Sequence, residues 1–333
     1  MGKLTNKELK KLLSCVRRGP QVIVPPLPGY DSGAHRLGNE TVVVSTDPCT
    51  GVPEAWFGWL LINYAASDVA LFGAKPEFCT VNLLGPLKTK TTVFEKAMQQ
   101  ACTAADELGM EIVAGHTATY ESLSQLLGVC TAYGTVKPEK LLTPGNSKAG
   151  DCILCTKPVG LETAVNFSLT QKAQAQKLFG QKRAEELASL VHMQGCVKDA
   201  LQLAAVDGVH AMHDATEGGL VAALNEMAEA SNLGFTIEFE RIRITLEMAA
   251  LRDAFELSDE QMLAMSSTGT ILAAVSPVAK DNVEKVVQKS GLTASFIGNF
   301  TYDGNRVLSK KGRDTPFPNV AEDPYARILS GKV

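Results

Sequence analysis

The strongest constraint on the fold comes from residues 55–74, AWFGWLLINYAASDVALFGA, where Asp68 is the only charged side chain. The run is long enough to cross a bilayer as a helix. Asn63, Ser67 and Asp68 lie near its middle, however, and a carboxylate at that depth in lipid is costly. We therefore expect a helix buried in a protein core, in which a partner group offsets the charge of Asp68.

The composition is that of a globular protein in a reducing compartment. A chain of 333 residues is long enough for about two domains. The formal net charge is −4 and basic clusters are short, such as Lys310-Lys311, which argues against a nucleic acid or an anionic membrane as partner. The N-terminal segment lacks the apolar core of a signal peptide. We therefore expect a cytoplasmic protein whose eight cysteines are mostly buried, reduced thiols.

The pattern of apolar residues predicts an α+β fold. In the first half we expect strands at 42–46, 78–84, 111–114 and 126–136, and helices at 56–72 and 93–108. In the second half we expect strands at 152–156, 235–239, 269–275 and 294–297, and helices at 171–177, 181–192, 195–205, 217–230 and 278–290. Residues 137–151 are rich in Pro, Gly and Lys and form the best candidate linker, which predicts domains at residues 1–145 and 146–333.

Three carboxylates in the first half have related settings. Asp31 precedes the first strong strand, in LPGYDSGA, Asp47 follows the end of that strand, in VVVSTDPCTG, and Asp68 lies in the apolar helix. Strand ends present ligand-binding groups in α/β proteins. A divalent cation relieves the repulsion among gathered carboxylates, and Mg²⁺ prefers oxygen ligands and usually bridges to phosphate. The pattern predicts a Mg²⁺–nucleotide site, although each aspartate taken singly also suits a turn or a hydrogen-bonded position.

A second candidate site lies in HDATEGGLVAALNEMAEA, residues 213–230. Asp214 and Glu217 have the spacing of a capping box before an apolar helix. Gly218 and Gly219 leave the backbone amides of the first turn open to a phosphate, which the helix dipole would favour. The same residues also suit a well-capped helix whose glycines allow close packing, and spacing alone does not decide between the two.

Three further motifs carry polar or thiol groups. Gly115-His116-Thr117 follows the strand EIVA, and His116 suits a general base, a phosphate donor or a hydrogen-bonded loop histidine. The hydroxyl-rich residues 266–270 either line a pocket or cap the apolar strand that follows. Cys152 and Cys155 form a CxxC on a predicted strand, where their side chains would face opposite ways, so we expect two core thiols rather than a metal site.

Together these motifs resemble the aminoimidazole-ribonucleotide synthetase superfamily. Its members include that synthetase, selenophosphate synthetase, thiamine-monophosphate kinase, formylglycinamidine synthase and the ATP-dependent hydrogenase-maturation dehydratase. The likeness rests on PGYDSGA with VVVSTDP, NYAASDVALFGAKP, EIVAGHTATY and HDATEGGLVAALNEMAEAS, and matching stretches run from about residue 28 to residue 300. It is strongest to the dehydratase and to the synthetase-related proteins near it.

The resemblance implies an architecture and a chemistry. The N-terminal α/β domain would form a shared barrel with a second copy, and the C-terminal domain would be an α/β sandwich that closes over ATP. The enzyme would transfer the γ-phosphate of ATP to an amide, carbonyl or similar oxygen of a small or protein-borne substrate. The partners implied are a second copy of the chain, making a homodimer, and a maturation partner protein.

The resemblance also assigns roles to residues. Asp31, Asp47 and Asp68 match acidic positions that hold Mg²⁺ and the ATP phosphates. The catalytic set would be Asp47, Asp68 and His116. The nucleotide contacts, besides Asp31, would be Asn63, Thr117, Thr216, Gly218 and Gly219.

Two departures from the family pattern bear on catalysis. His116 stands where relatives carry an acidic residue between Gly and Thr, and Glu217 stands where the dehydratase branch has arginine. Losing a cation beside a phosphate should weaken anion binding. The chain ends in ARILSGKV, without the terminal cysteine that the dehydratase branch modifies, so we expect no self-modification there.

The sequence therefore supports more than one function. The first hypothesis is an ATP- and Mg²⁺-dependent enzyme, favoured by the three aspartates. The second is a non-catalytic, nucleotide-binding regulatory or assembly protein, favoured by His116 and Glu217. A thiamine-monophosphate kinase is a third hypothesis, whose motifs fit less well. The sequence does not identify the phosphoryl acceptor.

Overall fold

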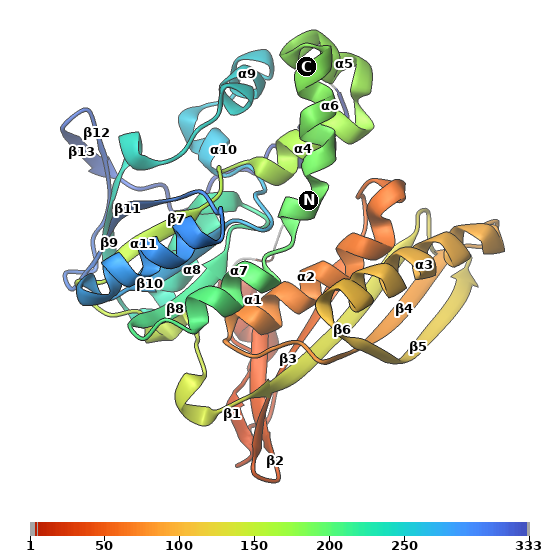
Figure 1. The fold of residues 1–333 in the computed structure, drawn as a ribbon, viewed down its shortest axis with the longest axis horizontal. Helices are drawn as coiled ribbons and strands as arrows, with labels where there is room; N and C mark the ends of the chain where they lie inside the picture. The colour runs from red at the N-terminus through yellow and green to blue at the C-terminus, as the bar shows by residue number, and fades with distance from the viewer. Residues whose placement is uncertain (1–3, 5, 332–333) are drawn as a thin grey trace. The chain divides into compact units, whose positions relative to one another are not determined.

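The computed structural model describes residues 4 and 6–331, and the chain divides into two compact units. The N-terminal unit consists of Val16–Pro26 and Asp31–Leu141. The C-terminal unit begins at Leu142 and also takes in Leu27–Tyr30 and the described residues before Val16. Each unit has its own sheet with helices packed on it (Figure 1), so the predicted two-domain α+β architecture is confirmed.

The N-terminal unit is built on a six-stranded sheet in the order β1-β2-β3-β6-β4-β5. Neighbouring strands run antiparallel except β4 and β5, which are parallel. The strands are β1 (Val22–Val24), β2 (Ser32–Leu37), β3 (Glu40–Cys49), β4 (Phe78–Pro86), β5 (Glu111–Tyr120) and β6 (Leu127–Val136). The strand β5, which carries His116, therefore forms one edge of the sheet.

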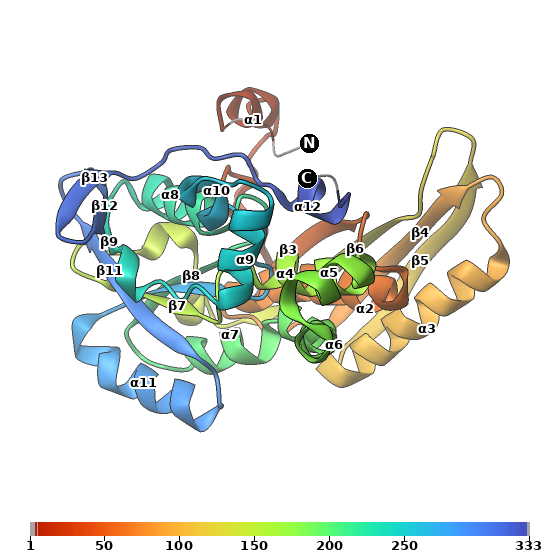
Figure 2. The same ribbon diagram turned by 90° about the horizontal axis from the view of Figure 1, so that it is seen from above.

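Two helices, α2 (Phe57–Leu71) and α3 (Thr91–Leu108), pack on this sheet. α2 contacts β3, β6 and α3, and Figure 2 shows α3 running beside β4 and β5. A helix that is apolar all round is buried, and α2 is buried along nearly its whole length, as predicted. A Cβ at Gly58 would lie 1.9 Å from the carbonyl oxygen of Ala97, so glycine is required where the two helices approach. Among the described residues, no helix has the length and apolarity needed to cross a membrane.

The C-terminal unit has a seven-stranded sheet in the order β13-β12-β9-β11-β7-β10-β8. The strands are β7 (Cys152–Thr156), β8 (Val209–Asp214), β9 (Gly234–Glu238), β10 (Ile271–Val275), β11 (Ala294–Thr301), β12 (Arg306–Lys310) and β13 (Arg313–Pro316). The helices are α1 (Asn6–Leu13), α4 (Leu161–Thr170), α5 (Lys172–Phe179), α6 (Gln181–Ser189), α7 (Val197–Ala204), α8 (Gly219–Ser231), α9 (Leu246–Ala254), α10 (Asp259–Leu263), α11 (Lys280–Lys289) and α12 (Tyr325–Leu329). Helices cover both faces of this sheet, with α7 and α11 on one side and α8 and α10 on the other (Figure 2).

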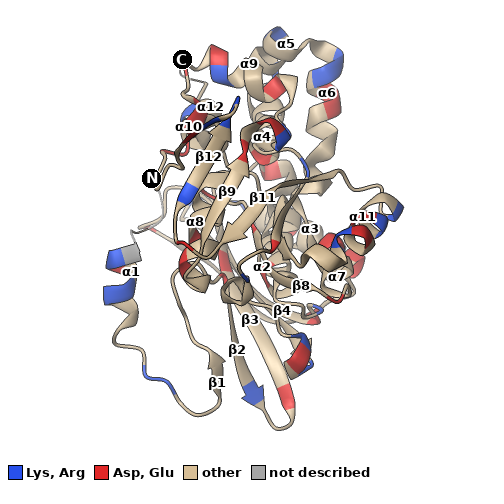
Figure 3. Cartoon of the chain, turned by 90° about the vertical axis from the view of Figure 1, so that its left-hand side faces the viewer, with Lys and Arg blue, Asp and Glu red and all other residues tan. Residues whose placement is uncertain are grey.

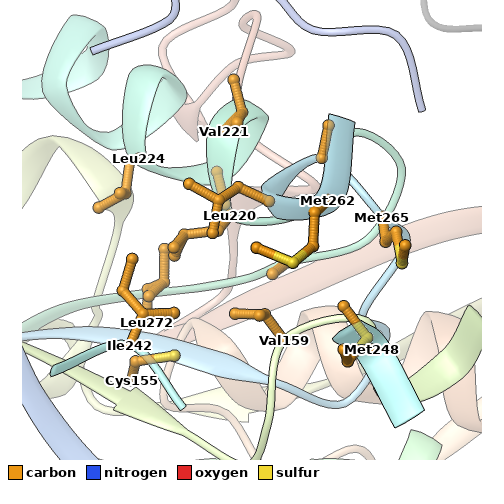
Figure 4. Packing of buried hydrophobic residues seen from close by; sticks show 14 of the residues in the cluster. Cys155, Val159, Leu220, Val221, Leu224, Ile242, Met248, Met262, Met265 and Leu272 are labelled. Carbon is orange, nitrogen blue, oxygen red and sulfur yellow. The ribbon is translucent and has the colours of Figure 1, made fainter. Parts of the chain in front are cut away.

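The core of the C-terminal unit lies between the sheet and the helices on the α8 side. Leu220 of α8, Met262 of α10 and Leu272 of β10 are all buried in it (Figure 4). On the other side, α11 buries Val283 and Val287 and carries Lys, Asp and Glu elsewhere on its surface (Figure 3). This one-sided burial is why α11 was predictable from its periodicity.

Most predicted elements are confirmed, and the misses have a local cause. The CxxC lies on β7 as predicted, and burial raises the pKa of the Cys155 thiol to about 12. The sequence did not reveal α4, which starts after Gly160 without a side-chain cap and contains the β-branched residues Thr163 and Val165. Weak propensity and a missing cap leave only tertiary packing to stabilise this helix. The other strands and α-helices that were not predicted are β1, β2, β8, β12, β13, α9, α10 and α12.

Candidate functional site

The N-terminal unit contains a buried polar cluster around Asp68. The Asp68 side chain, on α2, is buried, and the Ser45 hydroxyl on β3 donates to Asp68 Oδ2 at 2.7 Å. The same hydroxyl lies 3.1 Å from the backbone carbonyl oxygen of Asp31. Because a hydroxyl has one proton, Ser45 donates to only one of these oxygens at a time. The cluster thus joins α2, β3 and the start of β2.

Ser32 adds a second hydroxyl to this polar cluster. It pairs directly with Ser45 across β2 and β3, so the two side chains share a face of the sheet. Ser32 is 3% exposed, and its Oγ finds no hydrogen-bond partner within the part of the chain that the structure describes. A buried hydroxyl without a partner is costly unless a ligand or water meets it. Carboxylate, hydroxyl and carbonyl oxygens are the donor set that Mg²⁺ prefers, so these residues fit a bound Mg²⁺.

Asp47 lies on the same face of β3 as Ser45, two residues further along the strand, which is about 7 Å. It is half-buried and pairs in register with Cys130 of β6. A hydrogen bond with Cys79 and burial raise the pKa of Cys130, and the negative charge of Asp47 adds to that rise. The structure therefore places Asp47, Asp68 and the backbone carbonyl of Asp31 on one side of β3.

Asn63 does not join this cluster. It is buried on α2 and its Nδ2 donates to the carbonyl oxygen of Trp59, one turn earlier, at 3.0 Å. Asp68 follows Asn63 by five positions, which turns the two side chains about 140° apart around the helix. The amide nitrogen of Asn63 is thus engaged by its own helix, on a different side from the carboxylate.

His116 and Thr117 lie on the edge strand β5, away from the aspartates. The row Asp47–Cys130–Val81–Gly115 runs straight across β3, β6, β4 and β5. His116 is the next residue, so its side chain faces the opposite side of the sheet, about 14 Å across three strand spacings. It is exposed, and its Nε2 lies 3.3 Å from the Tyr120 hydroxyl. Within the N-terminal unit, the predicted catalytic set of Asp47, Asp68 and His116 does not converge.

The glycine loop of the C-terminal unit follows β8. Gly218 and Gly219 have φ angles of 80° and 53°, which favour glycine. α8 begins at Gly219 with Gly218 as its N-cap and no side-chain cap, so the predicted capping box of Asp214 and Glu217 does not form. Asp214 is instead the last residue of β8, paired with Ile271 of β10, and α8 starts five positions later. The half-buried Thr216 precedes them, and its carbonyl accepts from the Gly219 amide at 2.9 Å.

Asp323, which sequence reasoning did not identify, accepts hydrogen bonds at the glycine loop. Its Oδ2 accepts from the Gly218 amide at 3.1 Å and from the Ser266 hydroxyl at 2.6 Å. Ser266 belongs to the hydroxyl-rich loop noted in the sequence, whereas Asp323 lies in no motif. Here the amides and hydroxyls of two loops converge on one anionic group, which is the arrangement that binds phosphate or carboxylate.

Glu162 is a buried acid close to this loop. Its carboxylate accepts from the amide and the hydroxyl of Thr268, at 3.3 Å and 2.5 Å. The pKa of Glu162 is raised to about 7, chiefly by burial and in smaller part by the charges of Asp323 and Glu217, despite these hydrogen bonds. A carboxyl group of this kind changes its charge near neutral pH.

Both parts of the chain match a known family. Sequence models of AIR synthase related protein match at residues 29–136 for the N-terminal domain and 148–310 for the C-terminal domain. The selenide, water dikinase of Myxococcus xanthus is 29% identical over 261 residues, which cover 75% of this chain and 70% of that protein. The carbamoyl dehydratase HypE of Rhizobium leguminosarum bv. viciae is 26% identical over 287 residues, covering 83% of this chain and 78% of that protein.

Solved structures share the fold at low sequence identity. HypE of E. coli, a hydrogenase maturation protein, aligns with a TM-score of 0.74 and 19% identity over 97% of this chain and 98% of its own. A HypE in complex with ATP gives a TM-score of 0.68 and 17% identity, covering 96% and 92% of the two chains. A HypE–HypF complex gives a TM-score of 0.67 and 18% identity, covering 87% of this chain and 93% of the matched chain. Because the N-terminal domain model matches first along the chain and the C-terminal domain model follows it, the chain belongs to the AIR synthase related protein family, as its motifs predicted.

Proposed function

We propose that this protein is an ATP- and Mg²⁺-dependent enzyme that transfers the γ-phosphoryl group to an amide, carbonyl or similar oxygen of a small or protein-borne substrate. The observation that carries the proposal is the buried cluster of Asp68, Ser45 and Ser32, an oxygen-rich donor set with one hydroxyl lacking a partner among the described residues. Relatives named as a dikinase and a carbamoyl dehydratase, and a structural neighbour bound to ATP, support it.

The residues of the cluster would divide the work of binding. Asp68 and Asp31 would hold Mg²⁺, with Asp47 on the same face of β3. The Ser45 hydroxyl would donate a hydrogen bond either to the Asp68 carboxylate or to the Asp31 carbonyl oxygen. The Ser32 hydroxyl would form a hydrogen bond with the ligand. When bound, Mg²⁺ would neutralise negative charge on the phosphoryl group during transfer.

A calorimetric titration of ATP with Mg²⁺ tests this proposal most directly. In the wild-type protein we expect micromolar binding that requires Mg²⁺. Asp68→Asn should weaken it about 100-fold, equivalent to about 2.7 kcal/mol, because the shape stays and the charge is lost. Asp106→Asn, an exposed site on α3, is the matched control and should bind as the wild type does. If Mg²⁺-ATP binds neither protein, or binds Asp68→Asn unchanged, the proposal is wrong.

The non-catalytic alternative keeps a specific observation in its favour. His116 faces away from the aspartates on the opposite side of the sheet, and Glu217 adds an exposed carboxylate to the glycine loop. A protein that binds Mg²⁺-ATP without turnover, with or without candidate acceptors, would support the regulatory or assembly role. Phosphate release stimulated by thiamine monophosphate would instead indicate the kinase.

We also propose that the protein is a homodimer formed through β5. An edge strand presents unpaired backbone groups to another chain. On β5, Val113 is 51% exposed and Tyr120 is 44% exposed, so both side chains are accessible to a second copy of the strand. Light scattering on the purified protein would give twice the chain mass of 35.5 kDa if this is correct. A maturation partner protein remains a further prediction, which the solved HypE–HypF complex supports by analogy of fold.

A further inference from the structure

We propose that the loops at Gly218 and Ser266 form a phosphate-binding cradle that Asp323 occupies in the resting protein, so that a C-terminal strap competes with the ligand. The strap is residues 318–324, which join β13 to α12. The inference deepens the proposed function and rests on it for the identity of the ligand, a phosphate group of Mg²⁺-ATP. It adds a self-inhibitory contact that the family resemblance does not contain.

The hydrogen bonds of Asp323 carry the inference. Oδ2 accepts from the Gly218 amide at 3.1 Å and the Ser266 hydroxyl at 2.6 Å. Oδ1 accepts from the Ser266 amide at 3.3 Å and the Tyr325 amide at 2.9 Å. Three of these four donors therefore belong to the two loops rather than to the strap. They are backbone amides and a hydroxyl, the donors that proteins aim at phosphate oxygens.

A capping role explains only part of this arrangement. The bond from the Tyr325 amide is the ordinary local bond at the start of α12. The other three bonds are not needed to start α12, because they come from the loops before α8 and before β10. α8 has 13 residues and no side chain of its own at its N-cap, so Asp323 takes the place that an external anion would take.

The neighbouring charges make the carboxylate easier to displace. Asp323 and Glu217 both act on the buried Glu162, so negative charge is already concentrated at this loop. Removing the Asp323 carboxylate relieves that repulsion.

The strap is anchored at both ends, with Pro324 buried directly after Asp323, and its residues Asn319, Val320 and Glu322 are exposed. Phe317 is buried against Phe235, with ring centroids 4.9 Å apart, and Ile328 is fully buried. Between these anchors Val320 is 86% exposed, and the Asn225 amide holds the Pro318 carbonyl at 2.9 Å. Asp323 can therefore leave the cradle by a local change of the strap while both anchors stay in the core.

Titration of Mg²⁺-ATP into the full chain and two variants tests the inference. Asp323→Asn keeps the shape and one oxygen that can accept from the Tyr325 amide, but it removes the charge. Glu322→Gln removes the same charge from the exposed neighbouring residue. If the strap occupies the cradle about nine-tenths of the time, its loss should tighten the apparent Kd about tenfold in Asp323→Asn. Glu322→Gln should leave the Kd unchanged. Equal Kd values in all three proteins would overturn the inference and leave the proposed function standing. If no protein binds Mg²⁺-ATP, the proposed function fails and the inference fails with it.

A second measurement needs no variant and covers the case in which Asp323→Asn does not fold. Hydrogen exchange of the wild-type protein should show the Tyr325 amide exchanging at least about fivefold faster in saturating Mg²⁺-ATP, because it loses its acceptor when Asp323 is displaced. Amides in the centre of α11 serve as the internal control and should not change. Unchanged or slower exchange at Tyr325 in the bound protein would refute displacement of the strap.

Discussion

Replacing Glu162 by glutamine should make the C-terminal unit more stable at alkaline pH. Burial raises the pKa of Glu162 in the folded protein from 4.5 to about 7. Below pH 4.5 the folded and unfolded chains both hold the proton, so the residue has no effect on the balance between them. Between pH 4.5 and pH 7 Glu162 is ionised in the unfolded chain but still protonated in the folded chain, so the free energy of unfolding falls as pH rises. Above pH 7 Glu162 is ionised in both states, and the folded protein bears the full cost of burying its charge.

The size of the effect follows from the same two values. Their difference, at about 1.4 kcal/mol for each pH unit, corresponds to a cost of about 3 kcal/mol at pH 8. Glutamine carries no charge and keeps an oxygen that accepts from the amide and hydroxyl of Thr268. We therefore expect Glu162→Gln to match the wild type near pH 4.5 and to exceed its free energy of unfolding by up to about 3 kcal/mol at pH 8.

Urea unfolding of both proteins at several pH values between 4.5 and 8 measures this difference, and subtraction removes the titration of all other groups. Glu284→Gln, an exposed acid on α11, is the matched control and should show a flat difference close to zero. The reasoning is refuted if Glu162→Gln is less stable than the wild type at pH 8, or if its difference does not change with pH.

Two other predictions test the backbone and the thiols. Gly219→Ala should lower the free energy of unfolding by about 3 kcal/mol, since a residue with positive φ is strained and its Cβ would lie 2.5 Å from the Met265 carbonyl oxygen. Gly291→Ala, with a φ of 66° and open space around the added Cβ, is the control in urea unfolding and should cost about 1 kcal/mol. Maleimide at pH 8 should label the exposed Cys15 and Cys102 but leave Cys155 unmodified, because burial raises its pKa to about 12. Peptide mass spectrometry would contradict this if Cys155 were labelled in the folded protein.

The sequence predicted those parts of the fold whose signals are local. The helix α2 was recognisable because it is apolar on all sides, and α3 because its apolar spacing ends at Gly109, which has a φ of 65°. The strands β7 and β10 are continuous apolar runs buried on both faces. In contrast, Leu27–Tyr30 belongs to the C-terminal unit although it lies inside the first half of the chain. Such a return depends on contacts between residues distant in sequence, and no local pattern records it.

For the candidate site, the sequence identified residue types better than partners. Asp68 was expected to need a partner, but nothing in the sequence pointed to Ser45, which reaches it only because β3 packs on α2. His116 was grouped with the aspartates because it follows a strand end in the family pattern. The register from β3 through β6 and β4 to β5 turns its side chain to the other face, and a shift of one residue is enough to do so.

The choice between an enzyme and a binding protein therefore depends on the C-terminal unit more than on the aspartates. The Asp68 cluster offers carboxylate, hydroxyl and carbonyl oxygens, so binding of Mg²⁺-ATP is expected under either hypothesis. The glycine loop carries two unfavourable features for phosphate, the carboxylate of Asp323 in the cradle and the exposed carboxylate of Glu217. If Asp323→Asn raises both affinity and turnover, the strap is a regulatory contact on an active enzyme. If it raises affinity alone, the loop binds phosphate without transferring it. The next substitution to test would then reverse the charge at Glu217.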